Sequence, residues 1–405
     1  MKIGIISKGF DGWGGGIDFI RYIVSAIEVA DEKNQHEKYL LLAKNDWHFY
    51  AKKLSYPFRG LANSIRYEKT FKWQPFRGFD ENYLKHTFQD FQSFTLDFPG
   101  HSYHSHLEYS RKNKFDILLP CILPPSNNFN LPWIGYLYDF QHKYFPEFFT
   151  EREIARRDHA FTQMLQQADH VIVNANAVKQ DAEKFVSDIR AKIHVLPFSP
   201  SPMPIWLSES RDLRLHYAIE KPYFIISNQF WIHKDHITAF KGFAEFLEIV
   251  GKEFLLVCTG ETYDFRVPEY FEKLLDLAIE LGIKDDVKIL GHISKIDQIA
   301  LLKNSIAVIQ PTLFEGGPGG GASYDAISLG KPLIVSDIEV NREIDKDERV
   351  FFFKAKNAES LAYTMTKVAK TNFTTLTNQE LNSRGLAKKK LCGEFLLSLI
   401  QQSVS

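Results

Sequence analysis

The chain has 405 residues, of which 44% are hydrophobic, so it is long enough to form two domains with separate cores. Its 49 basic and 50 acidic residues give a formal net charge of -1, which excludes a nucleic-acid partner held by net charge alone.

The start of the chain and its cysteines indicate a cytosolic protein. Residues 1–7 are predicted to form a strand and not a signal peptide, because their apolar run is too short. No apolar stretch approaches the roughly 20 residues of a membrane-spanning helix. Cys121, Cys258 and Cys392 lack the spacing of a metal site and are predicted to be reduced thiols, the first two in apolar runs.

The first half of the chain alternates short apolar runs with amphipathic segments. The predicted strands are 2–7, 39–43, 116–120, 133–137 and 195–198, with helices at 17–29 and 161–168. Gly14, Gly15 and Gly16 separate the first strand from the first helix. A glycine turn at this place suits an approach to phosphate or substrate, but it also suits tight packing of strand on helix, and both interpretations stay open.

Residues 65–98 interleave basic and aromatic side chains, most densely up to Phe79. Cations next to aromatic rings suit either a membrane surface or stacking on sugar rings. An irregular insertion that packs its own aromatic side chains is the alternative.

Polar side chains follow the predicted strand 133–137. Tyr138, Asp139 and His142 would lie at its carboxyl end, where open α/β sheets bind ligands. The alternative is that Asp139 caps the following segment and that His142 is a surface residue.

A segment with three prolines and four serines, 199–209, is predicted to link two domains. Beyond it the predicted strands are 223–227, 254–258, 287–290, 306–310 and 350–353, with helices at 237–250, 322–329, 358–369 and 387–402.

The most informative segment is the glycine-rich loop between the strand 306–310 and the helix 322–329. Five glycines lie between Glu315 and Ala322, so the backbone N–H groups can approach a ligand closely. The helix start behind this loop favours an anion. Carboxylates repel phosphate, so Glu315 and Asp325 are predicted to accept hydrogen bonds from sugar hydroxyls. The loop therefore predicts a site for a phosphorylated sugar, and a flexible surface loop is the alternative.

This segment resembles the signature of glycosyltransferase family 4, retaining enzymes of the GT-B fold. That signature reads Glu-Gly-Phe-Gly-x-Pro-x-x-Glu-Ala-x-Ala-x-Gly-x-Pro and is followed by Val-Ile-x-Ser-Asp. Residues 325–326, Gly330, Pro332 and 334–337 match it in register. The chain departs from the signature because its two acids lie ten positions apart, further than in the family, and because the second acid is Asp325 and not Glu.

The resemblance implies roles for individual residues. Family members hold the donor diphosphate with an Arg and a Lys five residues later; Lys234 matches this Lys, but Gln229 stands where the Arg would be. They often carry His-Asp where this chain has Tyr138-Asp139. The implied catalytic residues are Glu315, Asp139 and Lys234. The implied donor-binding residues are Gln229, Gly316, Gly317, Gly319, Gly320, Ala322, Ser323, Tyr324, Asp325 and His292. The implied acceptor or phosphate loop comprises Gly14, Gly15, Gly16 and His142.

The fold that follows is α/β, of the GT-B type, with two doubly wound Rossmann-like domains facing each other across a cleft. We expect an acceptor-side domain at 1–205, joined by a helix at about 387–405 that packs back onto it. The nucleotide-sugar domain is expected at 206–386.

The implied function is retaining transfer of a sugar from a nucleotide diphosphate sugar to a glycan or lipid-linked acceptor, in bacterial surface polysaccharide synthesis. No cofactor and no metal are expected, although Asp345-Lys346-Asp347 superficially matches a metal motif of the other glycosyltransferase fold. The expected location is cytoplasmic, with contact of 65–79 to the inner membrane face left open. A non-catalytic GT-B subunit that binds glycan or a partner, and an epimerase of the same fold, are the alternatives.

Overall fold

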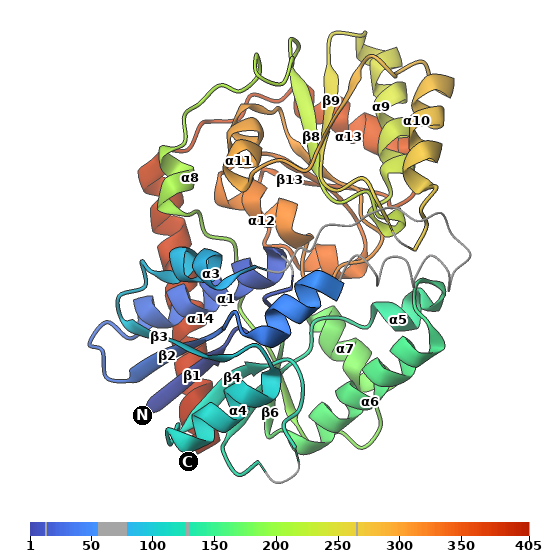
Figure 1. Cartoon of the computed structure of the whole chain (residues 1–405). Coiled ribbons are helices and arrows are strands. Elements are labelled where there is room, and N and C mark those ends of the chain that lie inside the picture. The colour runs from blue at the N-terminus through green and yellow to red at the C-terminus, as the bar shows by residue number, and fades with distance from the viewer. Residues whose placement is uncertain (13, 56–78, 127–128, 265, 405) are drawn as a thin grey trace. The chain divides into compact units, whose positions relative to one another are not determined.

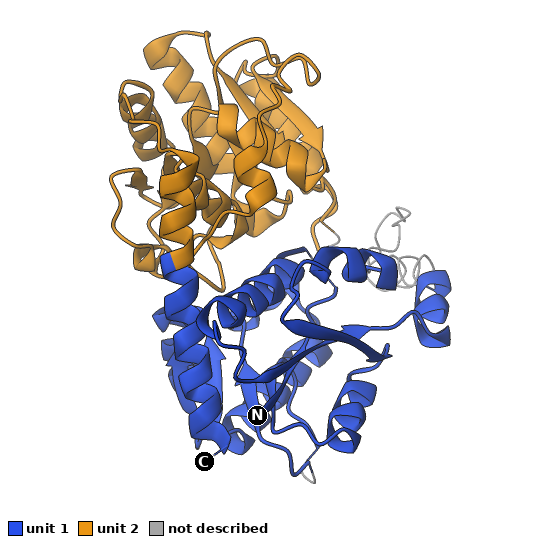
Figure 2. Ribbon diagram, turned by 90° about the vertical axis from the view of Figure 1, so that its left-hand side faces the viewer, with its two compact units in different colours: residues 1–198, 387–405 blue, residues 199–386 orange. Residues whose placement is uncertain are grey.

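The computed structural model describes residues 1–12, 14–55, 79–126, 129–264 and 266–404. It divides into two compact units, which Figure 2 colours separately. Unit 1 comprises Met1–Phe198 and Ala387–Ser405, and unit 2 comprises Ser199–Leu386. The predicted aromatic and basic segment 65–79 falls almost entirely outside the described residues; its last residue, Phe79, stacks on Tyr83 with ring centroids 4.5 Å apart.

Unit 1 is built on a seven-stranded parallel sheet in the order β3-β2-β1-β4-β5-β6-β7 (Figure 1). The chain runs outward from β1 in one direction and then, from β4 on, in the other, which makes the sheet doubly wound. Its strands are β1 (Lys2–Ile6), β2 (Glu37–Ala43), β3 (Phe94–Gly100), β4 (Ile117–Cys121), β5 (Trp133–Tyr136), β6 (His170–Val173) and β7 (Lys192–Val195). Its helices are α1 (Gly14–Ala30), α3 (Glu81–Phe88), α4 (Tyr103–Lys112), α5 (Gln141–Tyr144), α6 (Glu151–Gln167) and α7 (Asn176–Phe185), with the short 3-10 helix η1 (Pro146–Phe148).

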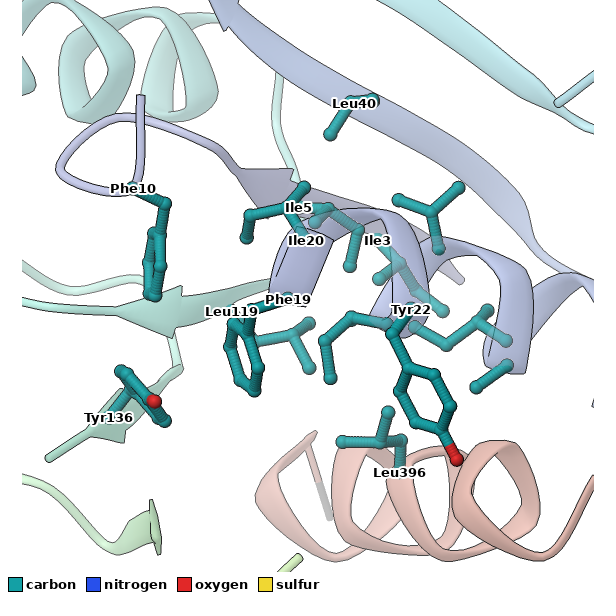
Figure 3. Close-up of a cluster of buried hydrophobic side chains, with 14 of the residues drawn as sticks. Ile3, Ile5, Phe10, Phe19, Ile20, Tyr22, Leu40, Leu119, Tyr136 and Leu396 are labelled. Atoms are coloured by element: carbon teal, nitrogen blue, oxygen red, sulfur yellow. The ribbon is translucent and has the colours of Figure 1, made fainter. Parts of the chain in front are cut away.

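The larger apolar cluster of unit 1 lies between its sheet and α1. Most residues of α1 from Gly16 to Ile27 are buried, and Ile5 pairs with Leu40 on one side and Leu119 on the other. The last helix, α14 (Asn378–Val404), adds Leu396 to the same cluster (Figure 3). A Cβ atom at Gly393 would lie 2.0 Å from the carbonyl oxygen of Ala26, so glycine permits the close contact of α14 with α1.

Unit 2 repeats this plan with a six-stranded parallel sheet in the order β10-β9-β8-β11-β12-β13. The strands are β8 (Tyr223–Ser227), β9 (Leu255–Thr259), β10 (Val287–Gly291), β11 (Val308–Gln310), β12 (Leu333–Ser336) and β13 (Val350–Phe353). The helices are α8 (Pro204–Ser208), α9 (His236–Val250), α10 (Tyr270–Glu280), α11 (Lys295–Asn304), α12 (Gly320–Ser328) and α13 (Ala358–Ala369), with the 3-10 helices η2 (Ile232–Lys234) and η3 (Glu339–Glu343).

Both faces of the second sheet are covered, as a parallel sheet requires. Along β8, Phe224 and Ile226 join one apolar cluster, while Tyr223 and Ile225 join another on the opposite face. The two doubly wound α/β units that the sequence predicts are therefore present.

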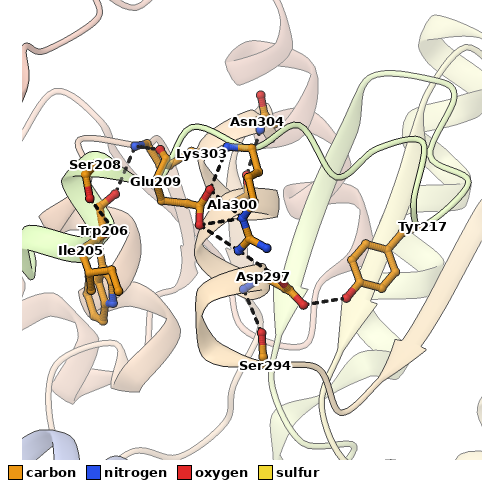
Figure 4. A network of polar contacts seen from close by, with 11 residues as sticks. Ile205, Trp206, Ser208, Glu209, Tyr217, Ser294, Asp297, Ala300, Lys303 and Asn304 are labelled. Carbon is orange, nitrogen blue, oxygen red and sulfur yellow. Dashed lines mark hydrogen bonds and ion pairs between the residues drawn. The ribbon is translucent and has the colours of Figure 1, made fainter. Parts of the chain in front are cut away.

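The segment 199–209, predicted as a linker, is ordered against unit 2, and the unit boundary lies at its start and not at residue 205. Trp206 of α8 is buried in the core, and Lys303 of α11 donates hydrogen bonds to the carbonyls of Trp206, Leu207 and Glu209 at 3.1, 3.2 and 2.5 Å (Figure 4). Arg211 extends this network to Asp297 at 3.1 Å. The short α8 leaves carbonyls without helical partners, and one ammonium group satisfies three of them.

The three cysteines are buried, and burial raises the pKa of the Cys121 and Cys392 thiols to about 12 and that of Cys258 further. Among the described helices, none is both long enough and apolar enough to cross a membrane.

Candidate active site

The glycine-rich loop connects β11 to α12 at the carboxyl edge of the second sheet. Gly319 and Gly320 adopt φ angles of 78° and 69°, in the left-handed region that favours glycine. A Cβ atom at Gly320 would lie 2.8 Å from the carboxyl carbon of Glu315. The loop thus places the Glu315 carboxylate directly against the first residue of α12, where helices favour negative charge.

A buried polar network holds this loop in shape. The Gly319 N–H donates to Asn341 Oδ1 at 2.8 Å, and Asn341 Nδ2 donates to the Ser336 carbonyl at 2.9 Å. The Ser336 hydroxyl donates to the Thr312 carbonyl at 2.5 Å. Asn341, Ser336 and Thr312 are fully buried, so each of these bonds forms in a region of low dielectric constant. The loop is therefore fixed before any ligand arrives.

Glu315 meets Lys234, the cation that the sequence predicts for the same site. Lys234 lies at the end of η2, in the turn after β8, and β8 pairs with β11. Its Nζ atom donates to Glu315 Oε1 at 2.5 Å, and the two side chains are 11% and 12% exposed. Two turns far apart in sequence thus place opposite charges in contact at one edge of the sheet.

Two buried side-chain amides, one bonded to Glu315 and one behind it, form a chain of hydrogen bonds to this carboxylate. Gln310 Nε2 donates to Glu315 Oε1 at 3.1 Å and to the Gly319 carbonyl at 2.8 Å. Asn228, at the end of β8, donates in turn to Gln310 Oε1. Asn228 and Gln310 were not among the residues predicted for the site, although each is a polar residue at the end of an apolar strand.

Lys234 stands between two buried histidines. Burial, followed by the positive charge of Lys234, lowers the pKa of His233 to about 2 and that of His236 to about 3. His236 stacks on Phe230 with ring centroids 4.3 Å apart. Both histidines are neutral at neutral pH, so the positive charge of this turn at that pH comes from Lys234.

Asp325 lies on a different face of the loop–helix unit from Glu315. Its Oδ2 atom accepts hydrogen bonds from Lys295 Nζ at 2.5 Å and from Gln298 Nε2 at 3.2 Å, both on α11. The two signature acids thus contact different cations and do not converge on one atom. Lys295 also lies 5.2 Å from the centroid of the Trp206 ring.

The other predicted donor-site residues differ in exposure. Gln229 and His292 are exposed, and the Gln229 carbonyl accepts a hydrogen bond from the Trp231 N–H at 2.7 Å. Gly317, Gly319, Ala322 and Ser323 are buried, whereas Gly316, Gly320 and Tyr324 are half-buried. The Ala322 side chain packs into the apolar core, so only its backbone is suited to a ligand.

In unit 1, the three predicted glycines lie inside α1, which begins at Gly14, and not in a turn before it. The first turn of a helix has backbone N–H groups without helical partners, so the start of α1 can still present donors to a ligand.

Asp139 follows β5 as predicted. Its Oδ1 atom accepts the Gln141 N–H at 2.9 Å and lies 3.5 Å from Arg157 Nη1. The side chain is 23% exposed, so a ligand can still reach it.

His142, predicted to face a ligand, is buried. Its Nε2 atom lies 3.0 Å from Asp158 Oδ1, and the rings of Phe140, Phe149 and Phe161 surround it. Burial lowers the pKa of His142. The His142 side chain is therefore packed among aromatic rings, and its role in acceptor binding stays a prediction.

Within the described parts of the chain, no group of three or more His, Cys, Asp or Glu side chains is arranged to hold a metal ion.

Comparison with known proteins agrees with this geometry. Residues 214–385, nearly all of unit 2 with the loop and its partners, match the family Glycosyl transferases group 1. The chain is 23% identical over 234 residues to the O-antigen chain mannosyltransferase RfbU of Salmonella typhimurium strain LT2, which covers 56% of this chain and 60% of that protein.

Two solved structures share the fold over nearly the whole chain. Sucrose-phosphate synthase from Thermosynechococcus elongatus gives a TM-score of 0.63 at 14% identity, with 99% of this chain and 98% of that chain covered. Anabaena Alr3699/HepE, in complex with UDP and glucose, gives 0.58 at 13% identity, with 99% and 98% covered.

The protein therefore has the GT-B fold, and within its second unit residues 214–385 match the Glycosyl transferases group 1 family.

Proposed function

We propose that the protein is a retaining glycosyltransferase of family 4 that moves a hexosyl group from a nucleotide diphosphate sugar to a hydroxyl of a glycan or lipid-linked acceptor. The observation that carries this proposal is the contact of Lys234 with Glu315 against the start of α12, inside the matched domain. The similarity to an O-antigen mannosyltransferase supports a role in bacterial surface polysaccharide synthesis.

The site offers what departure of a nucleoside diphosphate requires. Lys234 supplies a positive charge and the start of α12 supplies backbone N–H groups, both suited to a phosphate that gains negative charge. Glu315, held by Gln310, accepts hydrogen bonds from the donor sugar, so that Lys234 exchanges part of its contact with Glu315 for the diphosphate. Asp325 accepts from the ribose hydroxyls while Lys295 and Gln298 fix its orientation.

The bond changes are those of a substitution with retained configuration. The bond between the anomeric carbon and the phosphate oxygen breaks, and the acceptor oxygen bonds the same face of that carbon. The acceptor proton passes to an oxygen of the departing phosphate. This chemistry requires no metal, and we propose that the enzyme works in the cytosol without one.

A panel of UDP-, GDP- and dTDP-sugars, each offered with and without EDTA, tests the proposal. Release of the nucleoside diphosphate from one donor, unchanged by EDTA, is expected, with the anomeric configuration of the product retained by NMR. Binding of a donor without release or transfer would favour a non-catalytic subunit. Interconversion of free sugars or donors would favour an epimerase.

A further inference from the structure

The turn after β8, which binds the donor in our proposed function, contains no arginine, and the following inference rests on that function. Gln229 stands where the resemblance to family 4 places an arginine, and it carries no charge. Lys234 supplies one positive charge and is in contact with Glu315. A nucleoside diphosphate carries at least two negative charges, so one lysine does not match its charge.

Arg266 lies at the same edge of the second sheet. It belongs to the loop that follows β9, and β9 pairs with β8 in parallel, so the loops after both strands emerge side by side. The guanidinium carbon lies 4.8 Å from the centroid of the Trp231 ring, and the side chain is 9% exposed. Trp231 is three residues before Lys234, in the turn that also contains Gln229.

Asp264 fixes Arg266 to that turn. Arg266 Nε donates to Asp264 Oδ1 at 2.9 Å and Nη2 donates to Oδ2 at 3.3 Å, while the backbone N–H of Ile232 donates to the same Oδ2 at 3.3 Å. The Asp264 side chain is fully buried. A carboxylate that holds both the guanidinium and the backbone next to Trp231 makes the loop and the turn one rigid unit.

Further contacts connect the loop that carries Arg266 with the turn that carries Lys234. The Phe230 N–H donates to the Glu261 carbonyl at 2.8 Å, and the Lys234 N–H donates to the Trp231 carbonyl at 2.8 Å. Burial, followed by the positive charges of Lys234 and Arg266, lowers the pKa of His233, whose ring lies 5.6 Å from that of Trp231.

We propose that Arg266 is the second cation for the diphosphate of the donor and supplies, from the loop after β9, the guanidinium that Gln229 does not. A planar guanidinium binds phosphate oxygens in pairs, and a site that already holds it by packing and a carboxylate loses little side-chain entropy on binding. Stacking on Trp231 and the bond to Asp264 thus orient Arg266 before the donor arrives.

Binding by isothermal titration calorimetry tests this assignment, with UDP, GDP and dTDP as probes and with uridine, guanosine and thymidine as their uncharged counterparts. Arg266→Gln alone leaves Asp264 buried without its charged partner, so the main variant is the double substitution Arg266→Gln with Asp264→Asn. Its Kd for the bound diphosphate is expected to rise about 10- to 100-fold, as for loss of one charged hydrogen-bonding partner. The Kd for the matching nucleoside is expected to stay within about twofold.

Two further variants separate ligand binding from support of the fold. Arg211→Gln removes another arginine of unit 2 that is paired with acids, and is expected to change neither Kd. Gln229→Arg, added to the double variant, is expected to recover most of the lost diphosphate affinity because it returns a guanidinium to the same turn.

An equal loss for diphosphate and nucleoside, or no rescue by Gln229→Arg, would assign Arg266 a structural role and overturn the inference. A wild-type protein that binds a diphosphate as tightly as the double variant does would overturn it as well, while the proposed function stands. A wild-type protein that binds none of the diphosphates would overturn both.

Discussion

The Glu315 carboxylate is held in one position by contacts from three residues. Its Oε1 atom accepts from Lys234 and from Gln310, and the carboxyl group lies against Gly320. Replacing it by Gln removes the charge at nearly constant shape, so the variant tests the proposed hydrogen bond from the donor sugar to Glu315.

We expect Glu315→Gln to lower kcat/KM by roughly 10- to 100-fold, as for the loss of a charged hydrogen bond of about 1.5–3 kcal/mol. The fold is expected to remain intact, with a lower melting temperature because Lys234 loses its charged partner in a largely buried pair. Glu339→Gln, at an exposed glutamate of η3, is the control and is expected to leave kcat/KM unchanged. A Glu315→Gln enzyme within twofold of wild type would show that this residue does not contact the donor sugar.

Lys234→Ala should affect turnover more than donor binding. Negative charge on the leaving phosphate grows toward the transition state, so a cation there contributes most to kcat. We expect kcat to fall by about two orders of magnitude, as for removal of a preorganised donor of about 2.7–4 kcal/mol. Steady-state kinetics with the preferred donor measures this. An unchanged kcat for Lys234→Ala, with loss of activity in Gln229→Ala, would mean that the roles of these two positions are reversed.

The glycine-rich loop, at the scale of one element, contains a matched pair of neighbours. Gly320 has φ of 69°, and a Cβ atom there would collide with the Glu315 carboxylate, whereas a Cβ atom at Gly321 would meet nothing within 4 Å. Both residues begin α12, so they differ in local strain and not in secondary structure.

Gly320→Ala is therefore expected to lower stability by roughly 1–3 kcal/mol and to displace Glu315. Gly321→Ala is expected to be neutral or stabilising by up to about 1 kcal/mol, because alanine restricts the unfolded chain. Chemical denaturation of the two variants measures the difference. Equal stabilities would contradict the conformation described for Gly320.

Prediction from sequence succeeded for structural features that the residues of a single segment indicate by themselves. The helix α13 begins and ends where apolar periodicity places it, and the glycine-rich loop is visible in the chain alone. The contact of Asn228 with Gln310 was not predictable in this way, because it depends on β8 and β11 being neighbours in the sheet. The burial of His142 against Phe161 was likewise not visible in its own segment, and its role in acceptor binding stays a prediction.

The whole molecule contains buried histidines that make its stability depend on pH. Burial lowers the pKa of His106 in unit 1 to about 4, and those of His233 and His236 in unit 2 to about 2 and about 3, from 6.5. Each folded-state pKa lies below the unfolded value, so the unfolded chain binds more protons as the pH falls below about 6.5. The contribution of these histidines to the free energy of unfolding is therefore constant above this pH and decreases below it.

We expect the unfolding free energy of unit 2 to fall between pH 6.5 and 5 with a slope of up to about 1.4 kcal/mol per pH unit for each buried histidine. His236 suits the test, because both of its ring nitrogens are buried without a hydrogen-bond partner among the described residues. His236→Phe keeps an aromatic ring against Phe230 and removes the titrating group, so its slope should be lower by about one proton. Urea denaturation at pH 7.5, 6.5, 5.75 and 5 measures both slopes, with His104→Phe, at an exposed histidine, as the control. The His104→Phe slope is expected to equal that of the wild type. An equal slope for His236→Phe as well would contradict the prediction, because it would mean that His236 is already protonated in the folded state at pH 6.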